Sequence, residues 1–117
     1  MDPRRAVGNK GEDFAAAFFE SKGFRVIGRN WNCRMGEIDL IIERGEETRF
    51  IEVKTRFSTE FGYPEESITS AKLRHLARAI EMWIRENGEP KNYQADALAV
   101  LVLSGKEPQV EWIEGIL

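Results

Sequence analysis

Residues 37–56 read EIDLIIERGEETRFIEVKTR. Two apolar segments of strand length flank the polar sequence RGEE, and this pattern is typical of a β-hairpin. Because side chains alternate between the two faces of a strand, Glu52 and Lys54 share one face of the second segment. An ordinary strand does not need two unlike charges there, so both residues are candidates for a functional role.

The apolar residues of this stretch predict a register for the hairpin. If the turn is centred on residues 45–46, Leu40 faces Ile51 and Ile38 faces Val53. These four side chains then complete one apolar face. The hairpin is therefore expected to bury this face and to present its charged residues on the other.

The second face carries four charged side chains in the predicted register. Asp39 lies beside Glu52, and Glu37 lies beside Lys54. Two carboxylates about 5 Å apart on neighbouring strands destabilise a sheet unless a proton or a cation lies between them. Carboxylates suit Mg²⁺ or Mn²⁺, and a nearby ammonium suits a phosphoryl group, so the pattern indicates metal-dependent phosphodiester hydrolysis. The alternative is the solvated, charged face of a hairpin without such a site.

Length and composition limit the classes of protein to consider. With 117 residues, the chain is expected to form a single domain, 1–117. One cysteine and one histidine exclude a cysteine-rich zinc site, and a net charge of -3 argues against binding nucleic acid through bulk positive charge. No apolar run is long enough to span a membrane, and the N-terminus lacks a secretory signal, so we expect a cytoplasmic protein with no membrane partner.

Helices and further strands are predicted on both sides of the hairpin. The first helix covers residues 9–22, with an earlier start at Asp2-Pro3 as the alternative. The remaining elements are a strand over 24–29, a loop over 30–36, a helix over 70–87, a strand over 95–103 and an edge strand over 109–116. This order predicts an α/β domain with helices packed on a mixed sheet.

Several segments together resemble a known family. The sequences NKGEDFAAAFFESKGF, GRNWNCRMGEIDLII and FIEVKTR, with their spacing, resemble the YraN family of small bacterial proteins, in the restriction-endonuclease-like, PD-(D/E)XK superfamily. The resemblance continues through residues 72–76 and the segment around Asp96. It implies an αβββαβ core and a Mg²⁺-dependent phosphodiesterase site similar in layout to that of archaeal Holliday junction resolvases.

Carried onto this chain, the resemblance implies that Glu12, Asp39, Glu52 and Lys54 form the catalytic site. Asp39, Glu52 and Glu12 would hold Mg²⁺ or Mn²⁺, and Lys54 would stabilise developing charge. For Glu12 the alternative is a capping box that begins at Asn9, in which the glutamate only returns to the helix backbone.

Glu37 and Asp96 are expected to support this site rather than to bind the metal. Glu37 is interpreted mainly as the salt-bridge partner of Lys54, which does not exclude a role as a ligand. Asp96 matches an aspartate that the resemblance places in the later strand. It is either a supporting residue of the site or a hydrogen-bonded strand carboxylate.

Basic residues near the site are candidates for holding nucleic acid, because phosphate contacts position a nucleic-acid substrate. One side of the second predicted helix carries Arg74, Arg78 and Arg85. Lys72 lies in the region of the resemblance, and Arg56 follows the ExK segment. We expect this loop and helix to flank a substrate groove. The alternative is a solvated helix face and an ordinary connecting loop.

Three functions follow from these observations. The first is a metal-dependent nuclease that acts on DNA, including branched or structured DNA. The second is a nucleic-acid-binding or adaptor module that keeps the fold without turnover, which the acidic net charge and small size favour. In that case a partner or a homodimer would add binding surface. The third is a scaffold protein whose carboxylates form a charged sheet face.

Overall fold

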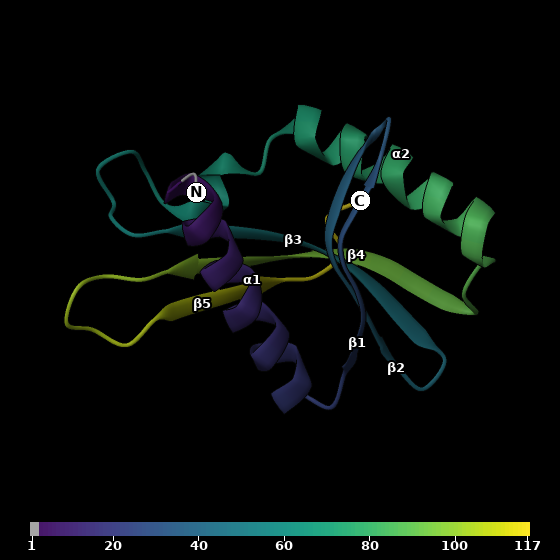
Figure 1. Cartoon of the computed structure of the whole chain (residues 1–117), viewed down its shortest axis with the longest axis horizontal. Helices are drawn as coiled ribbons and strands as arrows, with labels where there is room; N and C mark the ends of the chain where they lie inside the picture. Colours follow the sequence, from purple (N-terminus) through teal and green to yellow (C-terminus); the bar gives the residue numbers. More distant parts are fainter. Residues whose placement is uncertain (1–2) are drawn as a thin grey trace.

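The computed structural model describes the backbone of residues 3–117 and the side chains of residues 11–117. Figure 1 shows two helices packed on a twisted sheet. The elements are α1 (Pro3–Ser21), β1 (Arg25–Cys33), β2 (Gly36–Arg44), β3 (Glu47–Arg56), the 3₁₀ helix η1 (Pro64–Ser67), α2 (Ser70–Asn87), β4 (Asn92–Leu101) and β5 (Gln109–Ile113). Within the described residues, neither α-helix is long and apolar enough to cross a membrane.

The five strands form one mixed sheet in the order β1-β2-β3-β4-β5. Strands β1, β2 and β3 form an antiparallel meander, β3 and β4 are parallel, and β4 and β5 are antiparallel. A parallel pair needs a crossover connection, and the segment that contains η1 and α2 supplies it. This arrangement confirms the predicted α/β fold and is compatible with an αβββαβ core.

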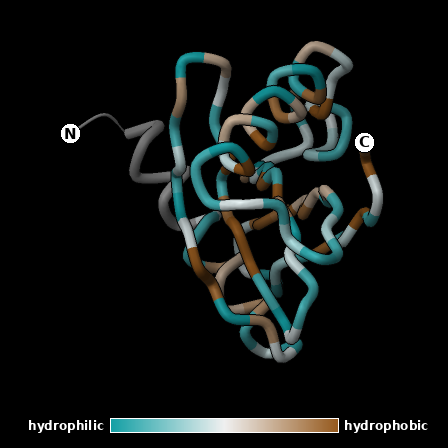
Figure 2. The backbone as a smooth tube through the Cα atoms, turned by 90° about the vertical axis from the view of Figure 1, so that its right-hand side faces the viewer, coloured by the Kyte–Doolittle hydropathy of each residue, from teal (hydrophilic) through white to brown (hydrophobic). Residues whose placement is uncertain are grey.

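Each face of the sheet buries a separate apolar cluster. The α1 cluster joins Phe19 to Leu40 and Ile51 of the sheet, and the α2 cluster joins Leu76 to Ile41 and Phe50. Figure 2 shows apolar segments of the chain running through the interior of the molecule. The two helices therefore cover opposite faces, and the central strands are buried between them.

The predicted register of the β2–β3 hairpin is confirmed from Leu40, opposite Ile51, to the end of β2 at the turn. The prediction that Ile38 faces Val53 is wrong, because the ladder stops at Leu40 and Ile38 packs in the α2 cluster instead. Beyond this point β2 stays paired with β1. The Asp39 Oδ2 accepts a hydrogen bond of 2.8 Å from the Val53 backbone N–H, so a side chain takes the place of a strand partner.

Two predicted boundaries near the N-terminus change. Helix α1 begins at Pro3, as the alternative prediction held, rather than at residue 9. Strand β1 continues to Cys33, so the predicted loop over 30–36 is wrong. Only a tight turn joins β1 to β2. Packing of Trp31 and Cys33 against the α2 cluster explains the longer strand. Helix α2 covers Ser70–Asn87, as predicted.

Candidate metal centre

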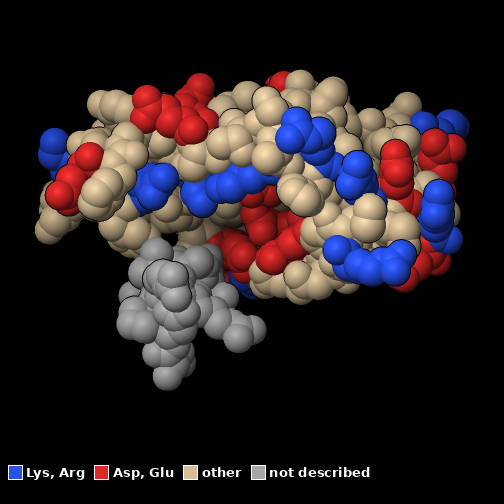
Figure 3. All heavy atoms as spheres, turned by 90° about the horizontal axis from the view of Figure 1, so that it is seen from above, with Lys and Arg blue, Asp and Glu red and all other residues tan. Residues whose placement is uncertain are grey.

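The candidate site lies where β2 and β3 separate. Because the ladder between these strands ends at Leu40 and Ile51, the strand residues beyond it are free to present side chains into the gap. Asp39 comes from β2, and Glu52 and Lys54 come from β3. Figure 3 shows acidic side chains gathered in a hollow in the middle of the molecule, with lysine and arginine side chains beside them.

Three carboxylates converge at this gap. Glu12, Glu37 and Asp39 each offer one oxygen atom, and these three atoms all lie within 4.8 Å of one another. Glu12 reaches the sheet because α1 passes very close to β3: a Cβ on Gly11 would stand 2.0 Å from the Thr55 Oγ1. Since α1 begins at Pro3, Glu12 lies inside the helix, and the capping-box interpretation is wrong.

Burial and repulsion between neighbouring carboxylates disfavour the ionised forms of Glu12 and Asp39. The Oε2 of Glu12 is buried and has no hydrogen-bond partner. Burial raises the pKa of Glu12, although a hydrogen bond with Asn30 lowers it in part. Burial and the nearby charge of Glu52 raise the pKa of Asp39 from 3.8 to about 8, against the lowering effect of the Val53 hydrogen bond. A divalent cation between these carboxylates would stabilise their ionised forms and so lower the pKa values of Glu12 and Asp39.

Glu37 belongs with the carboxylates rather than with Lys54. Its charge contributes to the raised pKa values of Glu12, Asp39 and Glu52. Among the described residues no ion pair joins Glu37 to Lys54, so the predicted salt bridge is wrong. Glu37 stands two residues before Asp39 in the strand, and this spacing was the signal for a common face.

Glu52 and Lys54 lie on the side of the sheet that α2 covers. Phe50 packs in the α2 cluster and Val53 in the α1 cluster, so strand alternation places Glu52 and Lys54 toward α2. Burial raises the pKa of Glu52, and the charges of Lys72 and Lys54 lower it. Burial and the proximity of Lys72 lower the pKa of Lys54. The first turn of α2 therefore brings Lys72 next to the ExK pair.

Asp96 lies in a different polar network. It is fully buried on β4. Its carboxylate accepts hydrogen bonds from Arg49 Nη1 at 2.9 Å, Trp112 Nε1 at 3.0 Å, the Gly115 backbone at 2.9 Å and Gln94 Nε2 at 2.8 Å. Both oxygens are thus occupied in joining β4 to β3 and to the C-terminal segment. This placement favours the alternative of a hydrogen-bonded strand carboxylate over a supporting role at the metal centre.

The remaining predicted residues lie around α2 and its approach. Arg56, at the end of β3, donates a hydrogen bond of 3.2 Å to the Ser67 Oγ of η1, while its buried Nε has no partner. Arg74 and Arg78 are exposed on α2. Arg56 therefore stabilises the crossover segment, and the two helix residues are available at the surface. That these residues bind nucleic acid stays a prediction.

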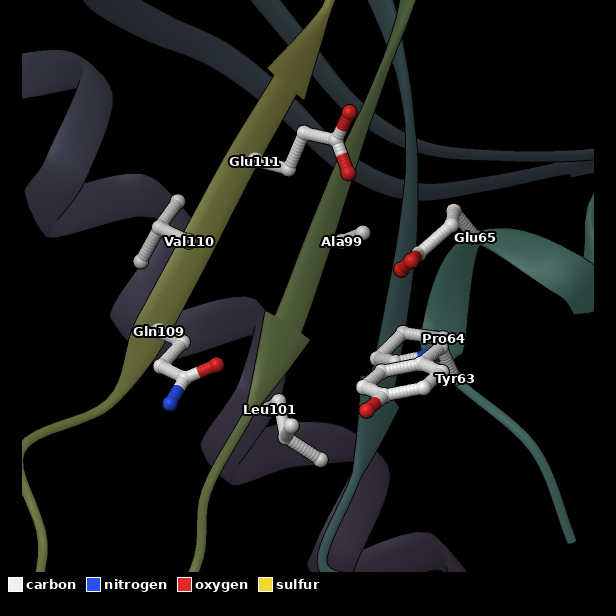
Figure 4. Close-up of a pocket in the computed structure, with 8 residues that line it drawn as sticks. All are labelled: Tyr63, Pro64, Glu65, Ala99, Leu101, Gln109, Val110 and Glu111. Carbon is white, nitrogen blue, oxygen red and sulfur yellow. The ribbon is translucent and has the colours of Figure 1, made fainter. Parts of the chain in front are cut away.

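A small pocket lies one strand beyond Lys54, because Lys54 pairs with Ala99 of β4 and Ala99 pairs with Glu111 of β5. In Figure 4, the side chains of Glu65 and Glu111 approach this pocket from opposite sides. Its lining consists of Tyr63, Pro64, Glu65, Ala99, Leu101, Gln109, Val110 and Glu111. With two carboxylates and no lysine or arginine in this lining, the pocket does not suit a phosphate group.

Comparisons with known proteins agree with the resemblance found in the sequence. The model of the uncharacterised protein family UPF0102 matches residues 11–100, which include all the converging carboxylates. A UPF0102 protein of Renibacterium salmoninarum is 43% identical over 117 residues, covering 99% of each chain. One from Leifsonia xyli is 40% identical over all of both chains, and one from Caldicellulosiruptor saccharolyticus is 41% identical over 83% of each. The chain therefore belongs to the uncharacterised protein family UPF0102, the YraN-like family.

Proposed function

We propose that this protein is a metal-dependent nuclease that hydrolyses phosphodiester bonds in DNA. The observation that carries the proposal is the convergence of Glu12, Glu37 and Asp39, with a buried glutamate oxygen that has no partner. Such a set of hard oxygen ligands suits Mg²⁺ or Mn²⁺. The resemblance to the PD-(D/E)XK superfamily supports the same chemistry.

The residues divide into those that hold the cation and those that face the substrate. Asp39, Glu12 and Glu37 would hold the ion, with Glu52 on the neighbouring strand as a further carboxylate. When bound, the ion would supply a water of lowered pKa and a positive charge for a phosphoryl oxygen. Lys54 would donate a hydrogen bond to a phosphoryl oxygen and neutralise the charge that develops there.

Substrate binding must come from a local basic surface, because the whole chain has a net charge of -3. Lys72 lies beside the ExK pair, and Arg74 and Arg78 extend from the same helix at exposed positions. Arg56 lies at the end of the ExK strand. These four residues would hold phosphates of the nucleic-acid substrate, in agreement with the sequence-based hypothesis.

The decisive experiment incubates the purified protein with linear duplex, single-stranded and four-way-junction DNA, with Mg²⁺ or Mn²⁺ and with EDTA. Cleavage should require the cation and should be lost in Asp39→Ala and Lys54→Ala. Glu107→Gln, in the exposed β4–β5 connection, serves as the control and should cleave normally. Cleavage that survives both site substitutions would contradict the proposal. Salt-dependent binding without cleavage under any metal would instead support the non-catalytic binding module.

A further inference from the structure

A second basic feature lies between α2 and the turn that joins β1 to β2. The groove there is lined by Arg34, Met35, Arg78, Glu81, Met82 and Arg85. Its three arginines and one glutamate leave an excess of positive charge, in contrast to the acidic net charge of the chain. We call it the arginine groove. Figure 3 looks onto this side of the molecule, where basic side chains occur on the same face as the acidic hollow.

The arginine groove is held in place by contacts between the β1–β2 turn and α2. His75 Nδ1 lies 3.2 Å from the backbone oxygen of Met35. Gly36 packs directly on the helix, and a Cβ there would stand 2.9 Å from the His75 backbone oxygen. Because Met35 and Gly36 are held against α2, the adjacent Arg34 lines the same groove as the helix arginines.

In the part of the chain whose side chains are described, no salt bridge holds the guanidinium groups of this groove. Among the described residues, Arg34, Arg78 and Arg85 make no ion pair with a carboxylate. In contrast, Arg25, Arg29 and Arg44 each make one, and Arg49 makes three. A guanidinium offers several N–H donors in a planar arrangement that matches phosphate oxygens. Three such groups around one groove suit a phosphate chain better than a single carboxylate ligand.

The position of the arginine groove relates it to the candidate metal centre. Lys72 lies beside Glu52 and Lys54, and Arg78 and Arg85 follow it along the same helix. At about 1.5 Å per residue, they lie roughly 9 and 20 Å farther along the helix axis than Lys72. A DNA strand carries one phosphate per about 3.4 Å of its axis, so the far end of the groove is roughly six nucleotides from the site.

We infer that the arginine groove is a second phosphate-binding site, which holds the nucleic-acid backbone roughly three to six nucleotides from the scissile phosphate. The inference rests on the proposed nuclease function and extends it. The substrate is a polynucleotide that continues past the cut along α2, so it must be longer than a dinucleotide. Arg34 and Arg85 join Arg78 as residues that position this backbone.

The first test measures binding of a fluorescent duplex of about 20 base pairs by anisotropy in EDTA, across a series of salt concentrations. The variant Arg34→Gln/Arg85→Gln should bind about tenfold more weakly, and the slope of log affinity against log salt should fall by about 2. The control Lys91→Gln/Lys106→Gln removes the same charge from exposed positions elsewhere. An equal loss in both variants, or no binding by the wild-type protein, would overturn the inference.

The second test separates this site from the catalytic proposal. Sodium tripolyphosphate is titrated into ¹⁵N-labelled protein, and the Nε–Hε signals of the arginines are followed by NMR. The signals of Arg34, Arg78 and Arg85 should shift, while that of Arg25, which pairs with Glu43, should not. Absence of these shifts would overturn the arginine groove even if the protein cleaves DNA. Shifts in a protein that cleaves no DNA would support the groove and refute the nuclease.

Discussion

Gly11 of α1 lies against Thr55 of β3 so closely that the helix and the strand have no room for a methyl group between them. This contact sets the height of α1 above the sheet at the residue next to Glu12. The approach of a helix-borne carboxylate to the strand carboxylates therefore depends on a glycine.

Gly11→Ala should destabilise the protein by about 1–3 kcal/mol, because the new methyl group would stand 2.0 Å from the Thr55 Oγ1. The gain in helix propensity, about 1 kcal/mol, offsets the clash only in part. Thr55→Ala removes the closest atom and should recover some of the lost stability in the double variant. Urea unfolding of the wild-type protein, the two single variants and the double variant measures the coupling energy between the two positions. If the two substitutions changed the free energy of unfolding in a strictly additive way, the contact between residues 11 and 55 would not be the cause of the lost stability.

The raised pKa of Asp39 predicts how stability depends on pH without metal. Asp39 binds its proton more tightly in the folded state, with a pKa of about 8, than in the unfolded state, near 3.8. Its contribution to the free energy of unfolding is therefore full at low pH and is lost as pH rises through this interval. Urea unfolding in EDTA from about pH 5 to 8 should show falling stability.

Asp39→Asn is the matched variant for this experiment, because asparagine keeps an acceptor for the Val53 N–H but does not titrate. Its stability should fall less steeply over the same range. Some slope should remain, since the pKa of Glu52 is also raised. Equal slopes for the variant and the wild-type protein would place the titrating group elsewhere.

Metal binding should need Glu37 as well as Asp39. Each offers an oxygen within 4.8 Å of the others in the carboxylate group. Mn²⁺ titrated into Glu37→Gln should therefore bind at least about tenfold more weakly than to the wild-type protein in isothermal calorimetry. Glu43→Gln is the control, because Glu43 lies on the same strand but pairs with Arg25. If Glu37→Gln bound Mn²⁺ with the same affinity as the wild-type protein, Glu37 would not be a metal ligand.

Asp96→Ala should cost about 3–5 kcal/mol of stability, because it leaves a largely buried Arg49 and the Trp112 indole without their common acceptor. Affinity for Mn²⁺ should not change, since Asp96 lies in a separate network. Glu114→Gln alters a partner of Arg49 whose side chain is 55% exposed, and should cost no more than about 1 kcal/mol. Denaturant unfolding and calorimetry together check both expectations. A loss of metal affinity in Asp96→Ala would link Asp96 to the metal centre.

Local sequence signals were sufficient to predict several elements. Helix α2 has an apolar stripe, an N-cap at Thr69 that accepts from the Lys72 backbone, and Gly88 at its end, so its bounds follow from residues within or next to it. The pairing of Leu40 with Ile51 follows from the turn and the apolar alternation beside it. In both cases the determining residues are close in sequence.

The missed features depend on contacts between distant segments. Ile38 turns to the α2 cluster because β2 leaves β3 at Leu40, and no pattern in either strand marks that point. The grouping of Glu37 with Glu12 follows from the same separation and from the close approach of α1. Arg34 joins the helix arginines only because the β1–β2 turn packs on α2. These relationships are tertiary, and short-range propensity does not encode them.

The parallel pairing of β3 with β4 also has a consequence for how the chain folds. Glu47 pairs with Asn92 and Arg56 with Leu101, so this pairing closes a long loop that contains the whole of α2. Non-local strand pairing is slow, because the entropy of loop closure is lost before the contacts form. The meander β1–β2–β3 needs only short connections. We therefore expect Asp39 and Glu37 to be in place early, and docking of α2 and β4, which brings Lys72 to Glu52, to limit the rate of folding.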